Sequence, residues 1–105
     1  MEQPELIGRW RADVAGQAGP IVLALAPHPE WEGTVKGRIE RPGGTSIVVG
    51  DVHQGALTLE ESRDARTVSG HWDGLVLEGS CGRTIRGEWS GEDDQPHAFT
   101  LTRLP

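Results

Sequence analysis

The sequence predicts an all-β fold, a single antiparallel up-and-down meander that closes into a small β-barrel of eight or nine strands. Apolar residues recur at spacing two, and turn residues follow about every eight to twelve positions. The chain has 15 glycines, seven prolines and one Met among 105 residues, with a hydrophobic fraction of 35%. This composition favours short strands and turns over long helices. The length fits one domain over residues 1–105.

The alternation of apolar and polar residues places the strands along the chain. A short helix around residues 27–32 is disfavoured by Pro27 and Pro29, because proline interrupts helical hydrogen bonding. Strands are expected near residues 5–14, 20–26, 33–40, 45–53, 55–61, 66–73, 75–79, 83–90 and 97–104.

Residues that are typical of turns then indicate how consecutive strands pair. Asp73-Gly74 favours a type I′ hairpin turn, whose twist matches its flanking strands. This turn would place Trp72 opposite Leu75. Further turns are expected at Gly43-Gly44 and over residues 80–83, with a polar loop over 92–96.

Five strands place a glycine between two apolar positions on one face. A glycine inside a strand permits a bulge or strong coiling, and it frees space for a bulky neighbour. Gly70 is therefore expected to bend its strand, while Trp72 fills the core or lines a pocket. The five glycines are Gly8, Gly37, Gly50, Gly70 and Gly87.

The Gly8-x-Trp10 unit, the later Gly-x-Trp strands and the final "HAFTLTR" strand resemble those of calycins, the superfamily of lipocalins, fatty-acid-binding proteins and avidins. The resemblance implies a barrel in which Trp10 packs at the closed end under Arg103. Arg103 would then reach Trp10 as a cation–π partner. The same pattern resembles small accessory barrels beside hydrolase domains and compact periplasmic protease inhibitors.

Charge and cysteine content narrow the classes of partner and compartment. Sixteen acids against ten bases give a formal charge of −6, which disfavours nucleic acid and anionic membrane as partners. Cys81 is the single cysteine, so no intrachain disulfide can form. The sequence shows no secretory signal and no stretch of membrane-spanning length, and a cytoplasmic location is expected.

Candidate catalytic and metal-binding chemistry is sparse. No nucleophile elbow, phosphate-binding loop or dinucleotide-binding motif is present. By alternation, the polar residues expected to face the lumen are Ser46, Glu61 and Arg103. We therefore predict neither catalytic residues nor a cofactor.

Two strand faces pair a carboxylate with an imidazole, Asp51 with His53 and His71 with Asp73. Such faces can ligate zinc. His71 and Asp73 point opposite to Trp72, however, and ordinary surface histidines are the preferred interpretation. No metal site is predicted.

The strand over residues 45–53 is apolar on both faces, because Ile47 and Val49 alternate with Val48 and Val52. A strand of this kind needs two coverings. One is the barrel core. The other is a second protomer or protein partner on Ile47 and Val49, or the loop over residues 27–32 with Trp31.

These observations favour a binding protein over an enzyme. The first hypothesis is a small apolar ligand in a lumen lined by Trp10, Trp72, Trp89 and Arg103. The alternative is a protein-interaction module, either an inhibitor or immunity-type protein or an accessory domain of an enzyme, that uses its acidic surface.

Overall fold

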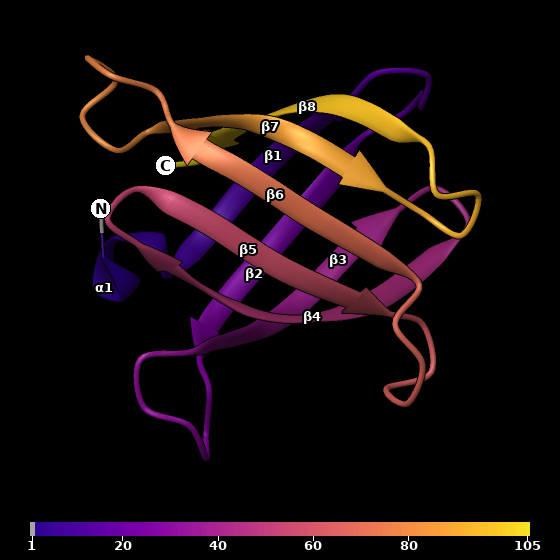
Figure 1. Cartoon of the computed structure of the whole chain (residues 1–105), viewed down its shortest axis with the longest axis horizontal. Coiled ribbons are helices and arrows are strands. Elements are labelled where there is room, and N and C mark those ends of the chain that lie inside the picture. Colours follow the sequence, from indigo (N-terminus) through magenta and orange to yellow (C-terminus); the bar gives the residue numbers. More distant parts are fainter. Residues whose placement is uncertain (1) are drawn as a thin grey trace.

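A computed structural model describes residues 2–105. Eight antiparallel strands follow one another around a closed barrel, and β8 pairs with β1 to complete it (Figure 1). A four-residue helix, α1 (Gln3–Leu6), precedes the first strand. The strands are β1 (Gly8–Val14), β2 (Ile21–Pro27), β3 (Val35–Arg41), β4 (Gly44–His53), β5 (Ala56–Ser62), β6 (Gly70–Val76), β7 (Thr84–Ser90) and β8 (Pro96–Arg103). The predicted meander and its closure are confirmed, with eight strands.

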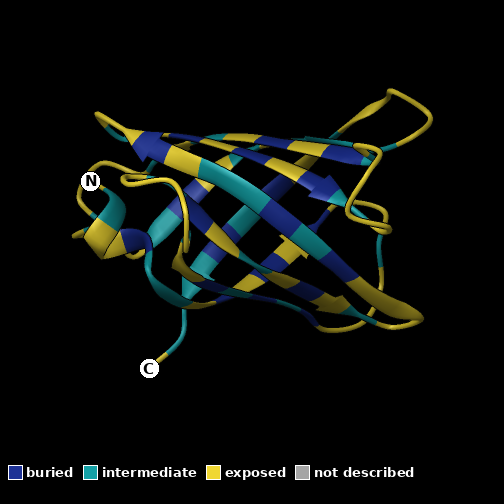
Figure 2. Ribbon diagram, turned by 90° about the horizontal axis from the view of Figure 1, so that it is seen from below, coloured by how far each residue is buried: buried dark blue, intermediate teal, exposed yellow. Residues whose placement is uncertain are grey.

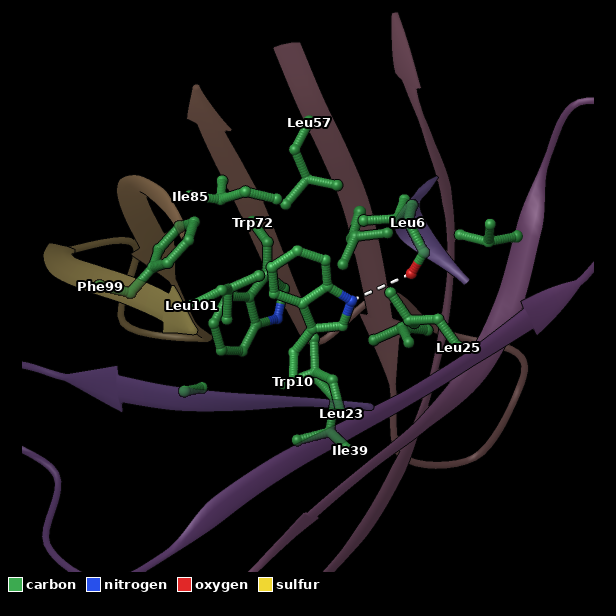
Figure 3. Packing of buried hydrophobic residues seen from close by; sticks show 14 of the residues in the cluster. Leu6, Trp10, Leu23, Leu25, Ile39, Leu57, Trp72, Ile85, Phe99 and Leu101 are labelled. Carbon is green, nitrogen blue, oxygen red and sulfur yellow. Dashed lines mark hydrogen bonds between the residues drawn. The ribbon is translucent and has the colours of Figure 1, made fainter. Parts of the chain in front are cut away.

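Burial alternates along the strands, as the changing colours in Figure 2 show, because successive side chains of a strand point to opposite sides of the sheet. Trp10, Leu23 and Trp72 are fully buried and lie near the centre of the barrel (Figure 3). Trp72 also packs edge-on against Phe99, with ring centroids 5.0 Å apart. The interior is therefore a packed core, as expected when eight strands enclose a lumen just wide enough for side chains.

The predicted hairpin at Asp73-Gly74 is wrong. Gly74 lies inside β6, where it pairs with Leu57 on one side and Gly87 on the other. Trp72 accordingly lies opposite Leu59 and Trp89 rather than Leu75. An Asp-Gly pair forms a type I′ turn only where both residues take positive φ, whereas Gly74 is not among the positive-φ glycines.

The chain instead turns after β6, in the loop over residues 77–83. Gly79, Cys81 and Gly82 have positive φ there, and the amide of Leu77 donates to the carbonyl of Thr84. The two strands expected at 66–73 and 75–79 thus form one strand. The predicted turn over residues 80–83 is part of this loop.

One other boundary differs from prediction, and one predicted hairpin is confirmed. The start of the strand expected from residue 5 is replaced by α1, where Glu2 and Glu5 form a reciprocal capping box and Pro4 lies in the first turn; both features stabilise a helix start. The hairpin expected at Gly43-Gly44 is present, with Arg41 paired to Gly44 across it.

Gly70 and Gly87 show the two uses of a strand glycine. A Cβ at Gly87 would lie 1.9 Å from the carbonyl oxygen of Asp73, so the neighbouring backbone occupies that space. A Cβ at Gly70 would lie 3.0 Å from Nε1 of Trp89. Gly70 thus makes room for the indole of Trp89, whereas Gly87 permits close approach of two strands.

Trp31 does not cover the outer face of β4. It stacks on His28 with ring centroids 4.4 Å apart and is 59% exposed. Over residues 2–105, no helix combines the length and apolarity needed to cross a membrane.

Candidate functional site

The two ends of the barrel are closed in different ways, and the predicted site residues divide between them. Trp10 and Arg103 lie at the end that α1 covers. Trp72 and Trp89 contact a buried carboxylate toward the opposite end. The polar contacts of the four predicted residues therefore form two groups, although Trp10 and Trp72 belong to the same buried core.

At the first end, Trp10 and Arg103 fix α1 to the barrel. The indole Nε1 of Trp10 donates to the carbonyl of Leu6 at 3.0 Å (Figure 3). The guanidinium of Arg103 donates to the carbonyls of Glu5 at 2.5 Å and Ile7 at 2.7 Å. These carbonyls lie in and just after α1, where they lack partners within the helix.

The contact predicted between Arg103 and Trp10 is present, because the guanidinium carbon lies 5.4 Å from the indole centroid. Trp10 and Arg103 are also directly paired between β1 and β8. They stand at the seam that closes the barrel.

Toward the second end, five inward-facing residues form the Glu61 cluster. Glu61 is 2% exposed, and its carboxylate accepts the Nε1 protons of Trp72 at 3.0 Å and Trp89 at 3.2 Å. Both guanidinium nitrogens Nη1 and Nη2 of Arg41 also donate to it. The members of the cluster are Glu61, Arg41, Trp72, Trp89 and Ser46.

These contacts keep Glu61 ionised inside the protein. Burial, the largest single influence, would raise the pKa of its carboxyl group. The hydrogen bonds from Arg41 and Trp72, the charge of Arg41 and the hydroxyl of Ser46 together outweigh burial, so the pKa lies below its ordinary value. An opposite charge and hydrogen bonds at a carboxyl group favour its ionised form.

Strand alternation explains how the cluster assembles. Ser46 and Glu61 face inward as predicted, 4% and 2% exposed. Arg41 was missed, because the strand was expected to stop at residue 40. The inward series Val35, Gly37 and Ile39 continues to residue 41, so extending the alternation by one step would have found it.

Among the described residues, one buried polar side-chain atom of the Glu61 cluster lacks a hydrogen-bond partner. Nε of Arg41 is buried without a hydrogen-bond partner within residues 2–105, while the Arg41 side chain is 18% exposed. Trp89 is partly buried and stacks at an angle on His97, with ring centroids 5.7 Å apart. The cluster joins five consecutive strands, β3 to β7, through one carboxylate.

The paired carboxylate and imidazole faces lie on the outer wall. Asp51, His53, His71 and Asp73 are all exposed. Across residues 2–105, no group of three or more His, Cys, Asp or Glu side chains is placed to hold a metal ion.

A row of acids crosses this outer wall at one height. Asp51 is paired with Thr58, Thr58 with Asp73, and Asp73 with Glu88. All four are exposed. Within the described residues, the three acids make no salt bridge with a basic side chain. We call Asp51, Asp73 and Glu88 the acidic row.

Beside the acidic row is an exposed leucine. Leu75 is 65% exposed and lies between Ala56 on β5 and Arg86 on β7. These three residues, with Asp73 and Glu88, contribute to the lining of a shallow hollow of about 370 Å³. An apolar side chain thus lies next to unpaired carboxylates.

No protein-family model matches this chain, and no curated protein sequence matches it at a significant level. Fold and site together define its class. It is a small closed up-and-down β-barrel whose lumen is filled by its own side chains. Its outer wall carries an acidic row beside an exposed apolar residue.

Proposed function

We propose that this protein is a protein-interaction module that binds a basic segment of a partner on the outer wall of β5, β6 and β7. The observation that carries the proposal is the acidic row beside Leu75. The packed interior also supports it, since Trp10 and Trp72 are fully buried by neighbouring side chains. Neither indole lines the hollows on the outer wall and at the ends of the barrel.

The acidic row is unfavourable for the isolated barrel. Like charges directly opposite each other on neighbouring strands destabilise a sheet, and Asp73 lies directly opposite Glu88. Lysine or arginine side chains of a partner would relieve this repulsion. An apolar side chain of the same partner would cover Leu75.

The acids of the β7–β8 loop differ from the acidic row because they have basic neighbours. Glu92 lies 3.6 Å from Arg63, and Asp93 lies 4.0 Å from His97. The loop is therefore a suitable control surface of the same charge.

The experiment measures binding of a fluorescent probe peptide of alternating lysine and leucine by anisotropy, beside thermal stability. For the double variant Asp73→Asn with Glu88→Gln, we expect binding to weaken about tenfold while the melting temperature rises. Salt should weaken the wild-type complex. The matched control, Glu92→Gln with Asp93→Asn, should bind as the wild type does.

Two results would refute the proposal. One is equal binding by the acidic-row and control variants. The other is binding that resists salt or accepts an alternating glutamate and leucine peptide equally well. A fall in melting temperature for the acidic-row variant would show that the acids of the row do not repel one another. The proposal of a basic partner would then lack its main support.

A small apolar ligand is the second candidate function, and the partly buried Trp89 beside Arg41 favours it. The guanidinium carbon of Arg41 lies 5.9 Å from the Trp89 ring centroid. A ligand that enters past Trp89 would shift tryptophan fluorescence on titration with fatty acids or haem, and Trp89→Phe would reduce the shift. An unchanged spectrum across such a panel would speak against this candidate.

A further inference from the structure

The outer face of β4 is apolar where the outer wall is otherwise mostly polar. Ile47 and Val49 project outward and are half-buried. Val68, on the loop between β5 and β6, is 44% exposed, and it lines with them a hollow of about 190 Å³. We call Ile47, Val49 and Val68 the β4 patch.

A cation and an anion lie on either side of this patch, both level with Val49 along the strands. Val49 is paired with Lys36 on β3 and with Glu60 on β5. Both charged side chains are exposed. Within residues 2–105, neither forms a salt bridge. The cation therefore lies on one side of Val49 and the anion on the other.

This arrangement is self-complementary under a two-fold rotation. If two copies face each other across β4 about an axis that runs along the strand, β3 of each copy lies over β5 of the other. Lys36 of each copy then meets Glu60 of its partner, and the two Val49 side chains meet between them. A perpendicular axis in the interface plane would place β3 over β3 and bring like charges together.

We propose that a second copy of this chain covers the β4 patch in an isologous dimer, with Lys36 and Glu60 paired across the interface. Surfaces related by a two-fold axis must be self-complementary, and the register of β3, β4 and β5 meets that requirement. The dimer is independent of the proposed binding of a basic partner.

The shape of the barrel limits the dimer to a weak one. Two convex walls diverge on either side of their line of contact, so only long side chains bridge the gap beside β4. Lys36 and Glu60 have that length. Contacts much smaller than a standard interface give weak, reversible association, so we expect dissociation in the micromolar to millimolar range.

Sedimentation at increasing protein concentration tests the dimer with two charge reversals, Lys36→Glu and Glu60→Lys. Each variant alone replaces two attractive contacts by two repulsive ones, so we expect its dissociation constant to rise about tenfold. A mixture of the two variants restores attraction on both sides and should form a heterodimer. The chain carrying both reversals should dimerise as the wild type does.

The matched control is Arg86→Glu, a charge reversal on the outer face of β7 that should leave dimerisation unchanged. Circular dichroism checks that every variant is folded. A wild type that stays monomeric up to about 1 mM overturns the proposal. So does a mixture of the two single variants that fails to associate. Peptide binding to the acidic row is measured separately and can succeed or fail independently.

Discussion

At the scale of single residues, Glu61 has the greatest consequence for stability. Removing one partner of a buried ion pair leaves the other charge without compensation, which is more costly than the loss of an exposed pair. Arg41 and two indole N–H groups depend on this carboxylate. We therefore infer that Glu61 stabilises the second end of the barrel.

Replacing Glu61 by glutamine should lower the free energy of unfolding by about 3 kcal/mol. The amide keeps one acceptor oxygen but removes the charge that balances Arg41. Chemical denaturation measures the change. The neighbouring Glu60→Gln alters an exposed carboxylate and should change stability by less than about 0.5 kcal/mol. Equal effects of the two variants would contradict this prediction.

The same residue predicts how stability depends on pH. Because the pKa of Glu61 is lowered in the folded protein from an ordinary value of 4.5, its stabilising contribution is complete above that value and is lost as pH falls through the folded pKa. The stability difference between the wild type and Glu61→Gln should therefore be constant near neutrality and shrink below about pH 4.5. A difference that stays constant or grows in acid would disprove the assignment.

At the scale of elements, the strands are shaped by close backbone contacts that glycine permits. Gly87 is opposite Gly74, and a Cβ at Gly87 would lie 2.4 Å from the Cα of Gly74. Neither backbone can move away without disturbing the pairing of β6 with β7. Glycine at these two positions therefore permits the close approach of β6 and β7.

Gly87→Ala should destabilise the barrel by at least about 2 kcal/mol, because the added methyl group meets backbone rather than a flexible side chain. Thermal or denaturant unfolding measures the loss. Gly44→Ala is the matched control, since a Cβ at Gly44 meets no atom within 4 Å. If both variants were equally stable, the close approach of β6 and β7 would not constrain residue 87.

At the scale of the whole molecule, closure joins all eight strands around one core. Trp10 and Trp72 share that core with side chains from α1 and the strands (Figure 3). Pairing of β1 with β8 joins segments from opposite ends of the sequence. No strand can leave the barrel without exposing this common interior.

Unfolding at dilute protein concentration should therefore be a single cooperative transition. The curves from far-ultraviolet circular dichroism and from tryptophan fluorescence are expected to coincide. Trp31→Phe removes the exposed indole and should leave the fluorescence midpoint unchanged. A separate early fluorescence transition would indicate that one end of the barrel opens independently.

The sequence predicted much of this architecture because strand alternation is a local signal. Inward-facing Ser46, Glu61 and Trp72 followed from that alternation alone. The prediction of a hairpin at Asp73-Gly74 was wrong because the packing of β6 between β5 and β7 outweighs the turn preference of these two residues. The helix α1 was missed because four residues give too short a periodic pattern.

The sequence by itself determined the fold class and the alternation that buries Trp10 and Trp72. Tertiary structure alone decided that Arg41, Trp72 and Trp89 share the carboxylate of Glu61, and that Lys36 and Glu60 flank Val49 at one height. The physical reason is that alternation assigns each residue to a face, whereas only the register between strands determines which residues on that face are neighbours.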